Sequence, residues 1–145
     1  MRQACNSFPS LEPLLPPGHA LDGNEQRRLL SLLAFSPTTE RPQLVAQVHL
    51  TGNEWRVLRA LIDAYPHYAP YARLLALLTP CSLEACQQRL RDARAHGNDV
   101  MKQVLRPLRK VLAGMQPKLG NLGLMAASVH AYGYLLVRFD EIARG

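Results

Sequence analysis

The sequence DVMKQVLRPLRKVLA occupies residues 99–113, and its apolar and basic side chains repeat with the period of a helix. At about 100° per residue the apolar side chains share one arc of roughly 140°, and the basic ones share an opposing arc of roughly 100°. We therefore predict a helix with one buried and one cationic side, capped by Asp99. The apolar set is Val100, Met101, Val104, Leu105, Leu108, Val111 and Leu112; the basic set is Lys102, Arg106, Arg109 and Lys110, with Gln103 at its edge.

Nearly all of the excess positive charge of the chain surrounds this stretch. Residues 89–118 hold eight basic and two acidic side chains, whereas the two signs balance in residues 1–88 and in residues 119–145. The whole formal net charge of +6 is therefore concentrated in this segment, where it produces a local positive field. A local cationic field attracts polyanions, of which nucleic acid is the commonest with a fixed shape in cells.

Length and composition exclude several other classes of protein. The chain has 145 residues, 48% hydrophobic and 19% charged, which is typical of a globular domain. It contains no apolar run long enough to span a membrane and no secretory signal, so we expect no membrane partner. Three cysteines without a disulfide pattern indicate reduced thiols and a cytoplasmic location.

The first half of the chain contains one clear helix start. Thr51 and Glu54 have the spacing of a capping box, and Leu50 and Trp55 that of a hydrophobic staple, with Trp55 expected in the core. Residues 43–50 alternate as a strand does. Upstream, residues 1–42 are predicted to form an N-terminal extension that begins with a Pro-rich arm. The apolar residues of Leu29–Phe35 fit two structures equally well: a short helix capped by Asn24, or a pair of strands.

The second half is predicted to hold two further helices before residue 99 and a β-hairpin after residue 113. Residues 71–78 form a short helix, and Ser82 caps another that ends at Gly97, with Leu83, Cys86, Leu90 and Ala93 as its apolar stripe. Residues 124–129 and 134–139 are rich in strand formers around Tyr132-Gly133, which predicts the hairpin.

Three patterns in this order resemble a known family. They are Leu50-Thr51-x-x-Glu54-Trp55-x-x-Leu58, then Leu105-Arg106-Pro107-Leu108-Arg109-Lys110-Val111-Leu112, and Val129-x-x-x-Gly133-Tyr134-x-Leu136. Residues 43–139 resemble the OmpR/PhoB-type winged-helix effector domain of bacterial response regulators, followed by a tail at 140–145. The resemblance implies a mainly α fold with a small β component, a winged helix-turn-helix with a C-terminal β-hairpin wing, and sequence-specific DNA-binding transcription regulation.

The resemblance also implies a set of DNA-binding residues. The recognition helix would bury Met101, Leu105, Leu108 and Leu112. Arginine and glutamine can bind base edges, and lysine holds phosphates. Tyr134 is expected in the core, whereas Tyr132 fits either the core or the wing tip. The residues expected to face double-stranded DNA are Lys102, Gln103, Arg106, Arg109 and Lys110 of the helix, with His130 and Tyr132 of the wing.

Departures from the family pattern support an alternative partner. We expect no receiver domain, and we expect an extra helix at residues 82–96. In addition, Pro107 stands where the family has Arg, and Ala131 stands where the wing of the family has Gly. A winged-helix module that binds RNA polymerase or another regulator is therefore the alternative function. A second placement of the helix-turn-helix, at residues 71–96, would make Arg89, Arg91 and Arg94 the DNA readers, but these three diverge on a helical wheel.

Other chemistry finds little support in the sequence. Cys81, Cys86 and His96 lack a convincing fourth metal ligand, so no metal site is predicted. No catalytic motif or phosphate-binding glycine loop is present, so we expect no enzyme, no cofactor and no small-molecule substrate. Specific binding by one small module favours a homodimer on repeated half-sites, for which Leu29–Phe35 is a candidate surface.

Overall fold

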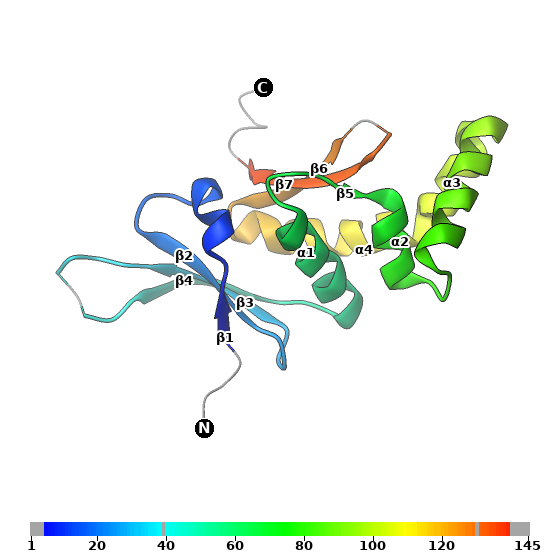
Figure 1. The fold of residues 1–145 in the computed structure, drawn as a ribbon. Coiled ribbons are helices and arrows are strands. Elements are labelled where there is room, and N and C mark those ends of the chain that lie inside the picture. Colours follow the sequence, from blue (N-terminus) through cyan, green and yellow to red (C-terminus); the bar gives the residue numbers. More distant parts are fainter. Residues whose placement is uncertain (1–4, 39, 130, 140–145) are drawn as a thin grey trace.

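The computed structural model describes residues 5–38, 40–129 and 131–139, and combines four α-helices within these residues with two small antiparallel sheets (Figure 1). Roughly half of the chain is helical and about a quarter is strand, so the fold is mixed α and β, with a larger β component than expected. The strands are β1 (Cys5–Ser7), β2 (His19–Asn24), β3 (Leu29–Ala34), β4 (Gln43–His49), β5 (Ala69–Pro70), β6 (Leu124–Val129) and β7 (Gly133–Arg138). The helices are α1 (Gly52–Ala64), α2 (Tyr71–Leu78), α3 (Leu83–His96) and α4 (Asn98–Asn121), with a 3-10 helix at Pro9–Leu14.

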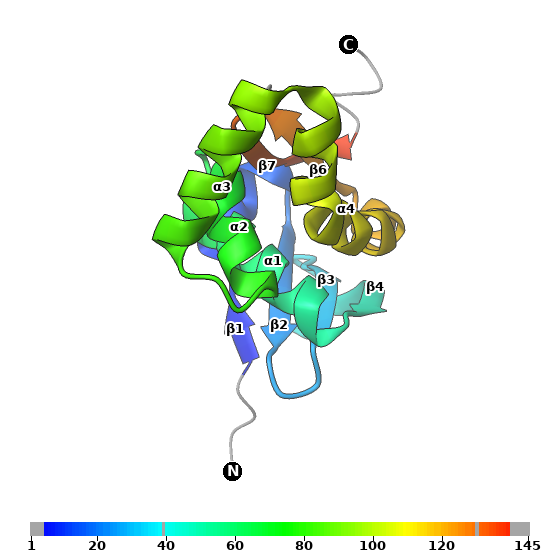
Figure 2. The same ribbon diagram turned by 90° about the vertical axis from the view of Figure 1, so that its right-hand side faces the viewer.

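The elements form layers around one core. Figure 1 shows the four-stranded sheet at one end of the molecule and α3 at the other, with α1, α2 and α4 between them. The three-stranded sheet runs along one side of these helices, and the end-on view of Figure 2 shows it above α4. None of the helices in the described part of the chain combines the length and the apolar character needed to cross a bilayer.

The N-terminal sheet decides between the two structures predicted for Leu29–Phe35. Strands β2 and β3 pair antiparallel, and β4 adds to the other side of β3. Asn24 caps the turn between β2 and β3 and not a helix, because its Oδ1 accepts the backbone N–H of Arg27 at 3.1 Å. Leu30 and Leu32 are buried in the core. The division predicted at residue 42 falls between β3 and β4, which are neighbours in this sheet.

Helix α1 begins as the sequence predicts. Thr51 Oγ1 accepts the backbone N–H of Glu54 at 3.2 Å, and Glu54 Oε1 accepts the backbone N–H of Thr51 at 2.9 Å. This is the predicted capping box, which satisfies two backbone donors that the helix leaves unpaired. Leu50 and Trp55 are both buried, as expected for a hydrophobic staple.

Helices α2 and α3 also form at the predicted residues. Ser82 Oγ accepts the backbone N–H of Ala85 at 3.1 Å at the start of α3, and Gly97, with a φ of 108°, ends the helix. The predicted apolar stripe of α3 is wrong in one residue. Leu83 is 46% exposed, because it lies in the first turn, away from the core that Cys86, Leu90 and Ala93 enter.

Helix α4 is longer than residues 99–113 and differs at its start. It continues through Pro107 and Pro117 to Asn121. The prediction that Asp99 caps it is wrong, since the N-cap is Gly97 and makes no side-chain hydrogen bond. Val100, expected on the buried side, is 37% exposed because the first turn of α4 extends beyond the core.

The C-terminal hairpin docks on the helices through a close backbone approach. Strands β6 and β7 pair antiparallel from Leu124 opposite Arg138 to Val129 opposite Gly133, and β5 pairs with β7 through Pro70 and Gly133. A Cβ atom on Gly133 would lie 2.0 Å from the carbonyl oxygen of Ala69, so only glycine permits this pairing. At its far end the hairpin is tied to the N-terminal segment, because Arg138 Nη2 donates to the carbonyl oxygen of Pro13 at 2.9 Å.

Candidate nucleic-acid interface

One side of α4 presents a set of polar and basic side chains that we name the basic face. All of its members are exposed, and together they line one shallow hollow on the surface. The opposite side of the helix supplies Leu105, Leu108 and Leu112 to the core, each no more than 4% exposed. The structure thus places the buried and the cationic sides of this helix as its periodicity predicts. The basic face consists of Lys102, Gln103, Arg106, Arg109 and Lys110.

The cations of the basic face have no carboxylate partner among the described residues. The two ion pairs found there join Arg59 to Asp63 and Lys118 to Glu54. Lys118 belongs to the positive stretch at residues 89–118, but its ammonium group forms an ion pair with the buried carboxylate of Glu54. The positive electrostatic field that a ligand would meet therefore comes from residues that precede Lys118 in the sequence, and above all from the basic face.

Arg109 marks the border between the basic face and the hairpin. It also lines a second hollow, formed by the first turns of α4, the end of α3 and the hairpin, which we name the junction hollow. Burial raises the pKa of the Tyr134 hydroxyl, as does the neighbouring Tyr71, while Arg109 acts in the opposite direction. Arg109 lines the junction hollow together with Ser128 and Ala131 of the hairpin, so a change at this residue acts on both surfaces.

The predicted wing residues have different environments. Tyr132 is 55% exposed, and its ring lies 6.0 Å from that of Tyr68. Tyr134 is half-buried and packs edge-on against Tyr71 at 5.7 Å, in agreement with its expected core position. The third predicted wing residue, His130, lies outside the described residues. Of the two tyrosines at the turn, only Tyr132 presents its ring to a ligand.

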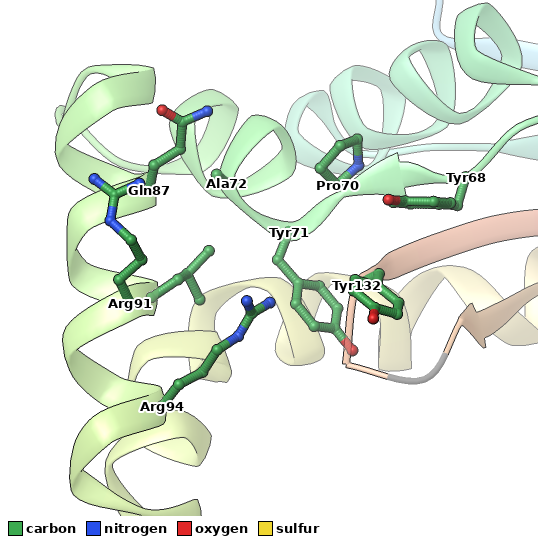
Figure 3. A pocket seen from close by; sticks show the side chains of 9 residues that line it. Tyr68, Pro70, Tyr71, Ala72, Gln87, Arg91, Arg94 and Tyr132 are labelled. Carbon is green, nitrogen blue, oxygen red and sulfur yellow. The ribbon is translucent and has the colours of Figure 1, made fainter.

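Arg94 of α3 contacts the hairpin turn, a feature that the sequence does not predict. Arg91 and Arg94 line a pocket together with Tyr68, Tyr71 and Tyr132 (Figure 3). Arg94 Nη2 donates a hydrogen bond to the carbonyl oxygen of Ala131 at 2.8 Å.

Arg89 takes no part in this pocket. Its Nη1 faces Cys81 Sγ at 3.8 Å. The divergence of the three α3 arginines on a helical wheel is thus real, and it separates two that line this pocket, Arg91 and Arg94, from one that does not. No signal within α3 itself could have found the pocket, since its other walls come from residues more than ten positions away along the chain.

The cysteines and histidines do not assemble into a metal site in the part of the chain that the structure describes. Cys86 is buried in the core, where its Sγ lies 3.8 Å from Thr79 Oγ1. Cys81 is half-buried beside Arg89. The Nδ1 atom of His96 lies 2.6 Å from the carbonyl oxygen of Asp92 in its own helix, away from both thiols.

Comparison with models of protein families, with curated proteins and with solved structures found no match to this chain.

Proposed function

We propose that this protein is a sequence-specific, DNA-binding regulator of transcription. In this proposal residues 43–139 act as a winged helix of the OmpR/PhoB type in the bacterial cytoplasm, with α4 as recognition helix and the β6–β7 hairpin as wing. The observation that carries the proposal is the basic face of α4, which is exposed and has no carboxylate partner among the described residues. A surface of that kind is the electrostatic footprint of a nucleic-acid-binding domain.

The order and pairing of the elements support the same proposal. Helices α1 and α2 precede the basic helix, and the hairpin follows it, in the order of a winged helix. The short strand β5, between α1 and α2, pairs with β7 and so fixes the hairpin against the helices. This pairing holds the exposed turn with Tyr132 beside the helix that carries the basic face.

The side chains of the basic face suit two kinds of contact. The major groove of B-DNA admits an α-helix, and there Arg106 and Gln103 have the donor and acceptor geometry for guanine and adenine edges. Lys102 and Lys110 are point charges on flexible chains, which suit phosphates and set the register on the duplex. Binding would release about one counterion for each phosphate that is neutralised.

A homodimer on repeated half-sites would supply further specificity, since one such module buries only about 600–1,000 Å² on DNA. The surface proposed for it at Leu29–Phe35 is restricted by the fold. Leu30 and Leu32 are buried, whereas Phe35 is 53% exposed. Leu44 and Val45 on the neighbouring edge strand β4 are also more than half exposed, so the exposed apolar side chains here are Phe35, Leu44 and Val45.

A second candidate function is a protein-interaction module for RNA polymerase or another regulator. Pro107 favours it, because this exposed residue interrupts the basic face with an imino acid that offers no donor to DNA. The α3 insertion between α2 and the basic helix favours it as well. In this case the basic face would meet an acidic protein surface.

Titration with duplex DNA at several salt concentrations separates the two candidates. If about five cations engage phosphates, the logarithm of the binding constant falls against the logarithm of the salt concentration with a slope of roughly −4 to −5. The sequence suggests R106E/R109E as the disabling variant, but Arg109 also lines the junction hollow. We therefore pair it with R106E/K110E, in which both sites are exposed and lie on the basic face only.

The expected result is loss of DNA binding in both double variants, with the circular dichroism spectrum of the unmodified protein retained in R106E/K110E. No binding of the unmodified protein even at low salt would refute the DNA proposal and leave the interaction module. Unchanged binding by R106E/K110E would show that the basic face is not the interface.

A further inference from the structure

We propose that the pocket between α3 and the hairpin turn binds the phosphodiester backbone of the same DNA duplex that the basic face engages. This inference rests on the proposed function and extends its footprint beyond α4. The pocket, which we name the arginine–tyrosine pocket, is lined by polar and aromatic side chains from three separate parts of the chain. They are Tyr68, Tyr71, Gln87, Arg91, Arg94 and Tyr132.

The chemistry of this lining selects an anion. Among the described residues, no aspartate or glutamate lines the pocket. Gln87, Arg91 and Arg94 come from α3, and Figure 3 shows Arg94 reaching from that helix towards Tyr71 and Tyr132. Guanidinium, amide and phenol groups all donate hydrogen bonds, and a guanidinium fork matches the oxygens of a phosphate.

Both arginines have donors to spare. Arg91 Nη2 donates to the side-chain oxygen of Gln88 at 2.8 Å, and Arg94 Nη2 donates to the backbone oxygen of Ala131. Each arginine has five N–H donors, so these neutral acceptors leave most of them available. Asp92, the acidic residue between the two arginines, accepts a bond from Gln88 at 2.9 Å and makes no ion pair with either in the described part of the chain.

The pocket is connected to the basic face by residues that line the junction hollow as well. The arginine–tyrosine pocket and the junction hollow share Tyr71 and Arg94. The junction hollow and the basic face in turn share Arg109. The three hollows therefore adjoin one another past the hairpin turn, with Arg94 and Arg109 as the cations at the two borders of the middle one.

This adjacency favours DNA over a separate acidic protein as the occupant. Duplex DNA carries a phosphate charge about every 1.7 Å along its axis, so a duplex held by the basic face offers further phosphates along the same track. The exposed ring of Tyr132 stands beside that track, where a hydroxyl can donate to a phosphate oxygen. Arg94 has a second role, because its bond to Ala131 fixes the turn that carries Tyr132.

The test compares two variants that each remove two positive charges. R91Q/R94Q alters the arginine–tyrosine pocket, whereas R73Q/R89Q alters two exposed arginines of α2 and α3 that line none of the three hollows. Binding to a duplex of unrelated sequence is measured across a range of salt concentrations. The salt slope should become less steep by about 0.9 for each phosphate that the variant no longer neutralises. We therefore expect a change of roughly two units in R91Q/R94Q and a far smaller one in R73Q/R89Q.

A single variant distinguishes the loss of phosphate binding from a disturbed hairpin. R91Q leaves the bond between Arg94 and Ala131 intact, and the salt slope of this variant should still become less steep by about one unit. Equal slopes for R91Q/R94Q and R73Q/R89Q, with DNA binding retained, would overturn this inference, leave the proposed function standing and place the pocket outside the DNA footprint. Absence of DNA binding by the unmodified protein would remove both the proposed function and the inference.

Discussion

Lys118 of α4 donates a hydrogen bond to Oε1 of Glu54 in α1, across 64 positions of sequence. The same oxygen accepts the backbone N–H of Thr51 at 2.9 Å, so one carboxylate oxygen both caps α1 and joins α1 to α4. Glu54 is only 5% exposed, and its charge is compensated by these two donors. The pair fixes the helix that carries the basic face to the first helix of the domain.

Replacing Glu54 by Gln tests the energetic value of this pair. Glutamine keeps an oxygen for the N–H of Thr51, as capping boxes allow, but it removes the negative charge beside Lys118. We expect a loss of about 1.5–3 kcal/mol in the free energy of unfolding, the usual range for hydrogen bonds to charged groups. Urea denaturation measures it, and a loss below about 0.5 kcal/mol would mean that the ion pair does not stabilise the fold.

The same pair should make stability depend on pH. Burial raises the pKa of Glu54, but the bonds from Lys118 and Thr51 outweigh burial and hold it below its ordinary value. The stabilisation is therefore complete above the ordinary glutamate pKa and disappears as the pH falls through the lowered pKa of the folded state. The difference in stability between the unmodified protein and E54Q should narrow over that acidic range, and a constant difference would contradict the assignment.

Two glycines of α4 offer a matched comparison. A Cβ atom on Gly114 would lie 2.8 Å from Oε2 of Glu54, whereas one on Gly120 would meet nothing within 4 Å. Alanine is favoured over glycine within a helix by up to about 1 kcal/mol. G120A should therefore be neutral or raise the melting temperature, while G114A should lower it because the carboxylate of Glu54 is held by two donors. Equal gains in both variants would show that Glu54 moves freely.

The sequence predicted the helices better than the N-terminal sheet. Capping signals at Thr51 and Ser82 are local, and both helix starts were found because a cap and its partner lie three residues apart. The strands before residue 43 depend on pairing with neighbouring strands and not on a cap, and the leucines at 29–33 fitted a helix and a strand equally well. The extension of α4 beyond residue 113 was missed for a similar reason. Leu119 is fully buried in the tertiary core, and burial there outweighs the cost of Pro117.

The candidate site shows the same division. The basic face lies on one helix, so periodicity alone located its five residues. The arginine–tyrosine pocket joins α3, the start of α2 and the hairpin turn, and no local pattern connects Arg94 to Ala131. Only the fold brings these two residues together.

Gly133 should be the least replaceable residue of the hairpin. Its backbone is not in the left-handed region, so the constraint is the approach of β5 and not its conformation. G133A would force apart two backbones and cost about 3 kcal/mol, near the upper end of overpacking penalties. S128A, at an exposed position of β6, is the control and should be neutral. A stable G133A protein with normal amide exchange at Tyr134 would contradict the close pairing with Ala69.

Pro107 should reduce the stability of α4. It lies in the interior of the helix and is exposed, so replacement by alanine leaves no cavity and restores a backbone donor. We expect P107A to raise the free energy of unfolding by about 1–3 kcal/mol, less than the full helix-propensity difference because proline also restricts the unfolded chain. Urea denaturation checks this, and a lower stability in P107A would mean that the proline itself makes a favourable contact.

Arg106 is the residue of the basic face whose replacement best distinguishes base reading from charge alone. It is exposed and, unlike Arg109, does not line the junction hollow. If its guanidinium binds a guanine edge, R106A should lose about 1–3 kcal/mol of binding free energy on a selected target duplex and show a weaker preference at one base pair. If the guanidinium binds a phosphate, the affinity of R106A for DNA should fall equally on all sequences, and its salt slope should become less steep by about one unit. R56A, at an exposed arginine of α1, is the control. Competition between selected and unrelated duplexes measures both effects, and identical behaviour of R106A and R56A would remove Arg106 from the interface.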